Sequence, residues 1–257
     1  MDSKSYLKRI GIDQIKNPSF EFLTELQNRH LLSIPFEDLD IPNKRIELDL
    51  NKIYNKIIPT KRGGFCYELN GLFHWLLTSL GFKVEMLSAR VFNSKKQDFG
   101  PEFDHMALLV HFNNEHFLVD AGFGDSFRSP IKLPDGEVED ISGHYRVLKS
   151  SVGNNRESVE NIFELQIKTG NNWIPQYCFS TLQRHLSDYR DMCIFQQLSP
   201  NSHFRTRMLC TIATDTGRIT LSNDSLTITE GVSKVKTSIE KKEEFNFMLK
   251  KYFNIVI

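Results

Sequence analysis

The stretch Thr60–Trp75, TKRGGFCYELNGLFHW, places a cysteine between a glycine pair and the start of a strongly apolar segment. From there, apolar residues recur at the spacing of one buried helix face, and Gly81 supplies a stop signal. The sequence therefore predicts a buried helix that begins at Cys66. The residues of the predicted buried face are Leu69, Leu72, Phe73, Leu76, Leu77 and Leu80.

The position of Cys66 suggests a reactive thiol. Backbone N–H groups at a helix start lack partners and the helix dipole favours an anion there, so we expect the pKa of the thiol to fall. Gly63 and Gly64 permit a tight turn and a close approach of backbone N–H groups to a substrate carbonyl. Taken alone, the position fits a small buried hydrophobic residue equally well.

The chain before this stretch reads mainly as helix. Residues 17–32 fit an amphipathic helix with Asn17 as N-cap and Pro18 at the first helical position. Residues 49–58 fit a shorter helix that ends at Pro59. These segments and the helix at Cys66 predict an N-terminal helical bundle.

The pattern changes after residue 83 to short segments rich in valine, leucine and phenylalanine, separated by Asn, Gly, Asp or Ser clusters. Such spacing is typical of an antiparallel meander or barrel, here to about residue 180. The predicted strand segments are 83–92, 105–112, 116–123, 145–150 and 163–168.

Helix and strand signals mix in the last part of the chain, with a hairpin predicted over 217–231 and an amphipathic helix over 238–256. The predicted fold class is α/β of the α+β type: an N-terminal helical bundle, a central antiparallel β-barrel and a C-terminal α/β lid. The expected domains are residues 1–85, 86–190 and 191–257.

A turn between two strand segments supplies partners for the cysteine. Asn113 and Asn114 suit the positive φ angles of a two-residue hairpin turn. In that register His105 and Asp120 lie on one face of the ribbon as diagonal neighbours, about 7–8 Å apart at Cα. A three-residue loop would put them on opposite faces.

A thiol with a histidine base and an orienting carboxylate is the arrangement used in acyl transfer by cysteine-protease-like enzymes. We expect Asp120 to fix the imidazole tautomer and His105 to take the proton of Cys66. The other histidines lack a comparable carboxylate, and His111 and His116 face each other near the turn. The three other cysteines are neither preceded by glycines nor placed at a predicted helix start, so we expect them to be core or incidental thiols. They are Cys178, Cys193 and Cys210.

Composition excludes several classes of protein. The 257 residues contain 32 Lys plus Arg and 32 Asp plus Glu, and a net charge of zero argues against general affinity for nucleic acid or membrane. Four scattered cysteines argue against a zinc site or a disulfide framework. From the cysteine spacing we expect no metal. No segment resembles an export signal or a membrane span, so we expect a cytoplasmic protein.

The motifs RGGFCYELN, DHMALLV and VDAGFGD appear in the order and spacing of the arylamine N-acetyltransferases, which the chain resembles over nearly its whole length. YLKRIGI and LLSIPFEDLDI are similar to that family's N-terminal part, SPNSHF to its Ser-Pro-x-Ser-x-Phe segment, and GRITL to its C-terminal part. One departure is Ala121, where the family more often has valine, and it should alter only packing.

The resemblance implies an acyltransferase of xenobiotic metabolism that works by a ping-pong mechanism. Acetyl-CoA acetylates the cysteine, and an arylamine or arylhydrazine then takes the acetyl group on nitrogen, or an arylhydroxylamine on oxygen. It implies Cys66, His105 and Asp120 as the catalytic triad, with acetyl-CoA as co-substrate and no prosthetic group.

The resemblance also implies binding residues. The Cys66 N–H and one near Phe103–Asp104 would form an oxyanion hole. Acceptor contacts are expected from Phe36, Phe65, Phe103, Asp104 and Phe123, and coenzyme A contacts from Gly124, Ser202 and Phe204. Core packing explains each of these phenylalanines equally well.

Other readings keep the triad but change the reaction. A cysteine-dependent thioesterase or amidase, or an amide synthase with a different acyl donor, is compatible with the same residues. A non-catalytic binding module with a vestigial triad is a further alternative, which a thiol pKa near its ordinary value of about 8.5 would favour.

Overall fold

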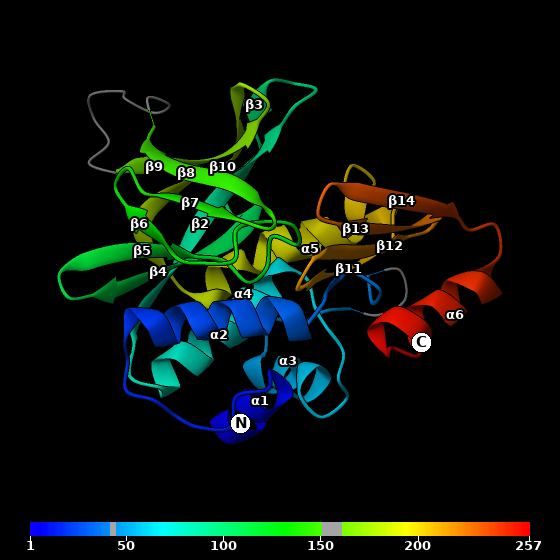
Figure 1. The fold of residues 1–257 in the computed structure, drawn as a ribbon, viewed down its shortest axis with the longest axis horizontal. Coiled ribbons are helices and arrows are strands. Elements are labelled where there is room, and N and C mark those ends of the chain that lie inside the picture. The colour runs from blue at the N-terminus through cyan, green and yellow to red at the C-terminus, as the bar shows by residue number, and fades with distance from the viewer. Residues whose placement is uncertain (42–44, 151–160) are drawn as a thin grey trace.

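The computed structural model describes residues 1–41, 45–150 and 161–257. Residues 151–160, inside the predicted barrel domain, lie outside the described residues. Helices of the N-terminal part lie beneath a large antiparallel sheet, and a second sheet with the C-terminal helix lies beside them (Figure 1). In the described part of the chain, none of the helices has both the length and the apolar character needed to cross a bilayer.

Among the described residues the N-terminal part contains four helices; the sequence predicts three of them, and the first was not predicted. The hydroxyl of Ser19 caps the second helix by accepting the Phe22 N–H at 3.1 Å, so the predicted Asn17 cap is wrong. Pro18 accordingly lies before the helix, because the short Ser19 side chain reaches the orphan amide first. The helices are α1 Ser3–Arg9, α2 Phe20–Ser33, α3 Leu50–Ile57 and α4 Cys66–Ser79.

Helix α4 is the central element of the core. Its predicted apolar face is fully confirmed, since every residue of that face, from Leu69 to Leu80, is buried. Gly81 follows the helix with a φ of +89°, a left-handed conformation that favours glycine. One side of α4 packs against the large sheet through β2, Lys83–Asn93, and β4, His105–Phe112.

The large sheet is antiparallel, with strand order β6-β5-β4-β2-β10-β9-β8-β7 and β3 paired to β2. Strand β6 also contacts β8, so the sheet curls into a nearly closed barrel, and the predicted barrel is confirmed. Its strands are β2 Lys83–Asn93, β3 Asp98–Phe99, β4 His105–Phe112, β5 Glu115–Val119, β6 Ile131–Leu133, β7 Glu137–Asp140, β8 Gly143–Lys149, β9 Ile162–Thr169 and β10 Asn172–Arg184.

The smaller sheet has the order β1-β11-β12-β13-β14. Its first strand, β1 Phe36–Glu37, comes from the N-terminal part and pairs with β11, and Phe36 also bridges to Gly64. The predicted hairpin over 217–231 is confirmed as β12 and β13. The strands are β11 Leu209–Thr214, β12 Gly217–Ser222, β13 Ser225–Glu230 and β14 Ser233–Ser238.

Helix α6, Lys242–Phe253, packs against this sheet through Phe245 and Leu249, which are buried. Between the two sheets the chain forms α5 Arg190–Leu198 with the short 3-10 turns Leu186–Tyr189 and His203–Arg205. Strand β1 therefore links the N-terminal helices to the C-terminal sheet. The exact domain limits at residues 85 and 190 stay a prediction.

Candidate active site

Cys66 is the first residue of α4, as predicted. The preceding Phe65 is the N-cap, and its N–H donates to Oε2 of Glu68 at 3.1 Å. A Cβ on Gly63 would lie 2.0 Å from the Pro35 carbonyl oxygen, and one on Gly64 would lie 2.8 Å from Cβ of Glu68. The glycine pair is thus required by close packing around the helix start.

A cluster of largely buried charged side chains surrounds the glycine pair and the start of α4. Lys56 lies 3.0 Å from the Glu68 carboxylate, and Arg62 contacts Glu37 at 2.8 Å and Asp40 at 3.0 Å. Burial raises the pKa of Glu68 to about 7, although Lys56 acts in the opposite direction. Two cations and three carboxylates therefore compensate one another beneath the glycine pair.

The predicted hairpin register is confirmed. Phe112 pairs with Glu115 across the turn, and the ladder continues in that register along β4 and β5. Asn113 and Asn114 have φ angles of 50° and 62°, the left-handed values that a two-residue turn of this kind requires. The turn chemistry therefore fixes which residues share a face at the far end of the ribbon.

At that far end His105 and Asp120 form a buried hydrogen bond. Nε2 of His105 lies 2.7 Å from Oδ2 of Asp120, and each side chain is at most 3% exposed. The second ring nitrogen, Nδ1, is left for another partner. Strand β5 stops at Val119, earlier than predicted, because the Gly122 N–H donates to Oδ1 of Asp120 and turns the chain out of the ladder.

Asp120 accepts hydrogen bonds from four groups. Besides His105 and the Gly122 N–H, the Tyr177 hydroxyl donates to Oδ2 at 3.0 Å and Nδ2 of Asn70 donates to Oδ1 at 2.9 Å. Burial alone would raise the pKa of the Asp120 carboxyl, but His105 and these donors outweigh it and hold the pKa below its usual value. The carboxylate is therefore ionised and fixed in orientation.

Asn70 was not predicted from the sequence. It lies one turn after Cys66 on α4 and is fully buried. Its Nδ2 also donates to the Met106 carbonyl at 2.5 Å, and its Oδ1 accepts the Ala121 N–H at 2.8 Å. A polar residue four positions after the cysteine, on an otherwise apolar helix face, is the signal that would have identified it.

Cys66 and His105 line one cavity of about 290 Å³. Of the predicted contact residues, Phe36, Asp104, Phe123 and Phe204 also line it. The remaining lining residues are Asp38, Val91, Gly122, His203, Arg207 and Leu209.

Four other predicted contact residues do not line this cavity in the described part of the chain. Phe65 is fully buried behind it, with its ring edge-on to Phe204 at a centroid distance of 6.2 Å. The Phe103 N–H donates to Oγ of Ser88 at 2.8 Å, so this amide is not available to an oxyanion. Ser202 is buried, and its Oγ donates to the carbonyl oxygen of Gln196 at 2.7 Å. The Gly124 carbonyl accepts a hydrogen bond from Arg218.

The pKa of Cys66 differs from the expectation. Burial raises the pKa of the thiol well above its ordinary value, and the negative charge of Asp104 acts in the same direction. The prediction of a lowered pKa was wrong because it considered the helix start and left out burial. An isolated thiolate is disfavoured in this cavity, so ionisation requires a cation beside the sulfur. His105 lines the same cavity and can supply that cation.

Asp38, on the cavity wall, was also missed by sequence reasoning. Burial raises the pKa of its carboxyl to about 7, while the Leu209 N–H, donating at 2.6 Å, opposes that shift. Its partner is 171 residues away in the chain, so no local pattern reveals the environment.

Among the described residues, no group of three or more His, Cys, Asp or Glu side chains is arranged to hold a metal ion. Cys178, Cys193 and Cys210 are buried free thiols, as the sequence predicts. Of these, Cys193 packs in the same core cluster as Cys66 but does not line its cavity.

Comparison with known proteins gives one consistent result. A family model described as N-acetyltransferase matches residues 19–257. The chain is 30% identical over 280 residues to the arylamine N-acetyltransferase, pineal gland isozyme NAT-3, of Gallus gallus, covering 100% of this chain and 95% of the relative. It is 26% identical over 273 residues to arylamine N-acetyltransferase 1 of Homo sapiens, covering 99% and 94%.

Solved structures agree. The arylamine N-acetyltransferase of Mycobacterium abscessus superposes with a TM-score of 0.89 at 29% identity, covering 100% of this chain and 90% of that one. The Bacillus cereus enzyme superposes with a TM-score of 0.89 at 25% identity over the full length of both chains, and is described as having a Cys-His-Glu triad. Here the carboxylate bonded to His105 is an aspartate. With matching sequence, fold and barrel, the chain belongs to the arylamine N-acetyltransferase family.

Proposed function

We propose that this enzyme transfers the acetyl group of acetyl-CoA to the nitrogen of arylamines and arylhydrazines, and to the oxygen of arylhydroxylamines, through an acetyl thioester on Cys66. The observation that carries the proposal is the buried 2.7 Å contact between His105 and Asp120 beside the cavity that Cys66 lines. Nucleophile, base and orienting carboxylate are the parts that acyl transfer requires.

In the first half-reaction, Nδ1 of His105 takes the proton of Cys66 while the sulfur attacks the thioester carbonyl of acetyl-CoA. The new C–S bond forms as the bond to the coenzyme sulfur breaks, and the imidazolium returns the proton to that sulfur. Asp120 stabilises the imidazolium and holds the tautomer. Because burial disfavours a lone thiolate, proton transfer to His105 and attack are coupled.

The developing oxyanion needs a donor. The proposed donor is the Cys66 N–H, in the first turn of α4, where amides have no partner within the helix. The predicted second donor is restricted to the Asp104 amide, since the Phe103 N–H is bonded to Ser88.

In the second half-reaction, the aromatic amine attacks the acetyl carbonyl and His105 takes the amine proton. The C–N bond forms as the bond between the acetyl carbon and the Cys66 sulfur breaks, and the imidazolium returns the proton to that sulfur.

Phe36 and Phe123 are proposed as acceptor walls and Phe204 as a coenzyme contact, because all three line the cavity beside Cys66. Gly124 and Ser202 do not line the cavity themselves. The residues next to them in the chain do, so both remain proposed coenzyme contacts. An aromatic lining suits a flat acceptor and excludes the water that would hydrolyse the thioester.

Four free cysteines favour a reducing compartment, which supports the proposal of a cytoplasmic location. The proposed partners are a small aromatic amine or hydrazine and coenzyme A, with neither nucleic acid nor membrane.

Steady-state kinetics tests the reaction. Release of coenzyme A from acetyl-CoA is measured against varied arylamine concentrations, alongside the acetylated product. We expect parallel double-reciprocal lines and one acetylated amine for each coenzyme released. A rate of coenzyme release that does not depend on the amine concentration would indicate a thioesterase or amidase. Slow release from acetyl-CoA but fast release from another acyl donor would indicate an amide synthase.

A further inference from the structure

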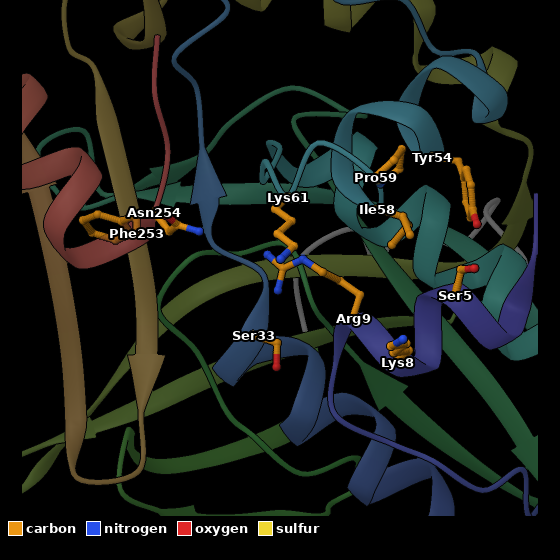
Figure 2. Close-up of a pocket in the computed structure, with 10 residues that line it drawn as sticks. All are labelled: Ser5, Lys8, Arg9, Ser33, Tyr54, Ile58, Pro59, Lys61, Phe253 and Asn254. Carbon is orange, nitrogen blue, oxygen red and sulfur yellow. The ribbon is translucent and has the colours of Figure 1, made fainter.

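A second cavity, of about 630 Å³, is separate in lining from that of Cys66 and has a strongly basic wall (Figure 2). It is bounded by α1, the ends of α2 and α3, and the end of α6. Three cations line it: Lys8, Arg9 and Lys61. The other polar lining residues are hydroxyl or amide groups, and no Asp or Glu lines it in the described part of the chain.

The cations of this cavity lack counter-charges in the described part of the chain. Among the described residues, no carboxylate lies within ion-pair distance of Lys8, Arg9 or Lys61. Nε of Arg9 is buried and has no hydrogen-bond partner there. A buried donor requires a partner, and an anion at this place would supply one.

Figure 2 shows the Arg9 and Lys61 side chains extending toward each other across the middle of the pocket. The amide nitrogen of Asn254 points to the same region, while its Oδ1 accepts a hydrogen bond from Lys250 at 2.6 Å. Two like charges that face one another repel, and an anion between them reverses the sign of that interaction. The donors therefore converge on a place suited to negative charge.

The backbone at Lys61 supports this reading. Its φ is +57°, a left-handed conformation that costs a residue other than glycine on the order of 1 kcal/mol. Its neighbour Arg62 contacts two carboxylates, Glu37 and Asp40, which do not line the cavity. Of these two neighbouring cations, the one with the strained backbone is Lys61, which lines the cavity.

We propose that this cavity binds a small molecule carrying phosphate or pyrophosphate groups, held by Arg9 and Lys61 with Lys8 at the side. Arg and Lys donors with hydroxyl and amide groups are the chemistry that recognises phosphoryl oxygens. Ile58, Tyr54 and Phe253 add an apolar wall that can accept the organic part of a phosphorylated ligand. Lys61 lies five positions before Cys66, so an occupied site would restrain the segment that leads to the nucleophile.

Isothermal titration calorimetry with sodium pyrophosphate at low ionic strength tests the proposal. The wild-type chain is compared with Arg9→Gln/Lys61→Gln, and with the charge-matched control Lys4→Gln/Lys95→Gln, whose lysines are exposed and outside the cavity. We expect saturable one-to-one binding by wild type and control, and at least about tenfold weaker binding by the cavity variant. Thermal unfolding of each variant confirms that it is folded.

Inorganic phosphate and ADP, titrated in parallel, distinguish the sources of the phosphoryl group. Tighter binding of ADP than of pyrophosphate assigns the site to an organic phosphate that uses the apolar wall. Equal binding assigns it to inorganic phosphoryl anions. Absence of saturable binding to the wild-type chain, or equal affinity in the cavity variant and the control, would overturn the proposal.

Discussion

The two ends of the β4–β5 hairpin each carry a histidine with a close polar partner, yet they differ in chemistry. At the open end, His105 lies 2.7 Å from the Asp120 carboxylate, and both are buried. At the turn, Nδ1 of His111 lies 2.8 Å from Nδ1 of His116, and Nε2 of His111 lies 3.2 Å from the Glu85 carboxylate, with the His111 and Glu85 side chains each about a fifth exposed. One ribbon thus shows that an imidazole becomes a candidate base only where burial and a fixed carboxylate coincide.

A third histidine separates the effect of burial from the effect of a carboxylate partner. His30 is fully buried, with the Tyr6 hydroxyl 2.7 Å from its Nδ1 and no carboxylate partner among the described residues. Burial, assisted by the charge of Arg9, lowers its pKa to about 3. Burial without a carboxylate therefore keeps an imidazole neutral, and the Asp120 carboxylate is what distinguishes His105.

The largest effect is expected from Asp120→Asn. An amide cannot stabilise the imidazolium or fix the tautomer as a carboxylate does, so kcat/KM for acetyl transfer should fall about 10³–10⁴-fold. The measurement is steady-state acetylation of an arylamine, with circular dichroism as the folding control. Activity within tenfold of wild type would show that His105 does not need the Asp120 carboxylate to act as a base.

Asn70→Ala tests whether the Asn70 amide holds the Asp120 carboxylate in position. It removes two donated bonds and leaves the Ala121 N–H unpaired, so Asp120 and His105 should shift and kcat fall by about 10²-fold. The matched control is Gln27→Ala, which removes another fully buried amide, bonded to the Phe127 carbonyl outside the cavity.

Both variants should lose about 1–3 kcal/mol of stability. Only Asn70→Ala should lose turnover beyond its loss of folded protein. An equal fall in kcat in both variants would mean that Asn70 acts through stability alone.

The pH dependence of the unfolding free energy tests how burial alone affects the histidine His30. The pKa of His30 is about 3 in the folded chain, and about 6.5 is expected when unfolded, so the unfolded state binds more protons between these values. The unfolding free energy should fall as pH decreases from 6.5 toward 3, by up to about 1.4 kcal/mol per unit. Denaturant titrations measure it.

The ring resonances of His30 in NMR should show no titration above pH 5. The variant His30→Gln should flatten the stability profile in this range. A folded-state midpoint for His30 near 6.5 would contradict the account.

The smallest effect is expected at the turn. His116→Gln removes a surface contact with His111, so the unfolding free energy should change by no more than about 0.5 kcal/mol. Turnover should stay at the wild-type level, which the same acetylation assay checks. A loss of turnover above threefold would show that the two ends of the hairpin are coupled.

The sequence predicted the histidine–carboxylate contact because the information is local. Asn113 and Asn114 set the turn, the turn sets the register, and a period of two places His105 and Asp120 on one face. The start of α4 at Cys66 was equally local, since the glycine pair and the apolar spacing lie next to each other in the chain.

The remaining parts of the site depend on distant contacts. Tyr177 reaches Asp120 from β10, and β1 pairs with β11, which no short-range pattern reveals. The expected fall in the Cys66 pKa failed for the same reason, because burial is a property of the whole fold. Phe65 likewise satisfies an aromatic motif but packs in the core.

Intact-mass spectrometry after exposure to acetyl-CoA, without an amine, tests the central claim most directly. The wild-type chain should gain the mass of one acetyl group, about 42 Da, which peptide mapping should place on Cys66 and which an arylamine should remove. Cys66→Ala should remain folded and unmodified. An equal adduct on Cys66→Ala, or its absence from an active wild-type enzyme, would contradict an acetyl-cysteine intermediate.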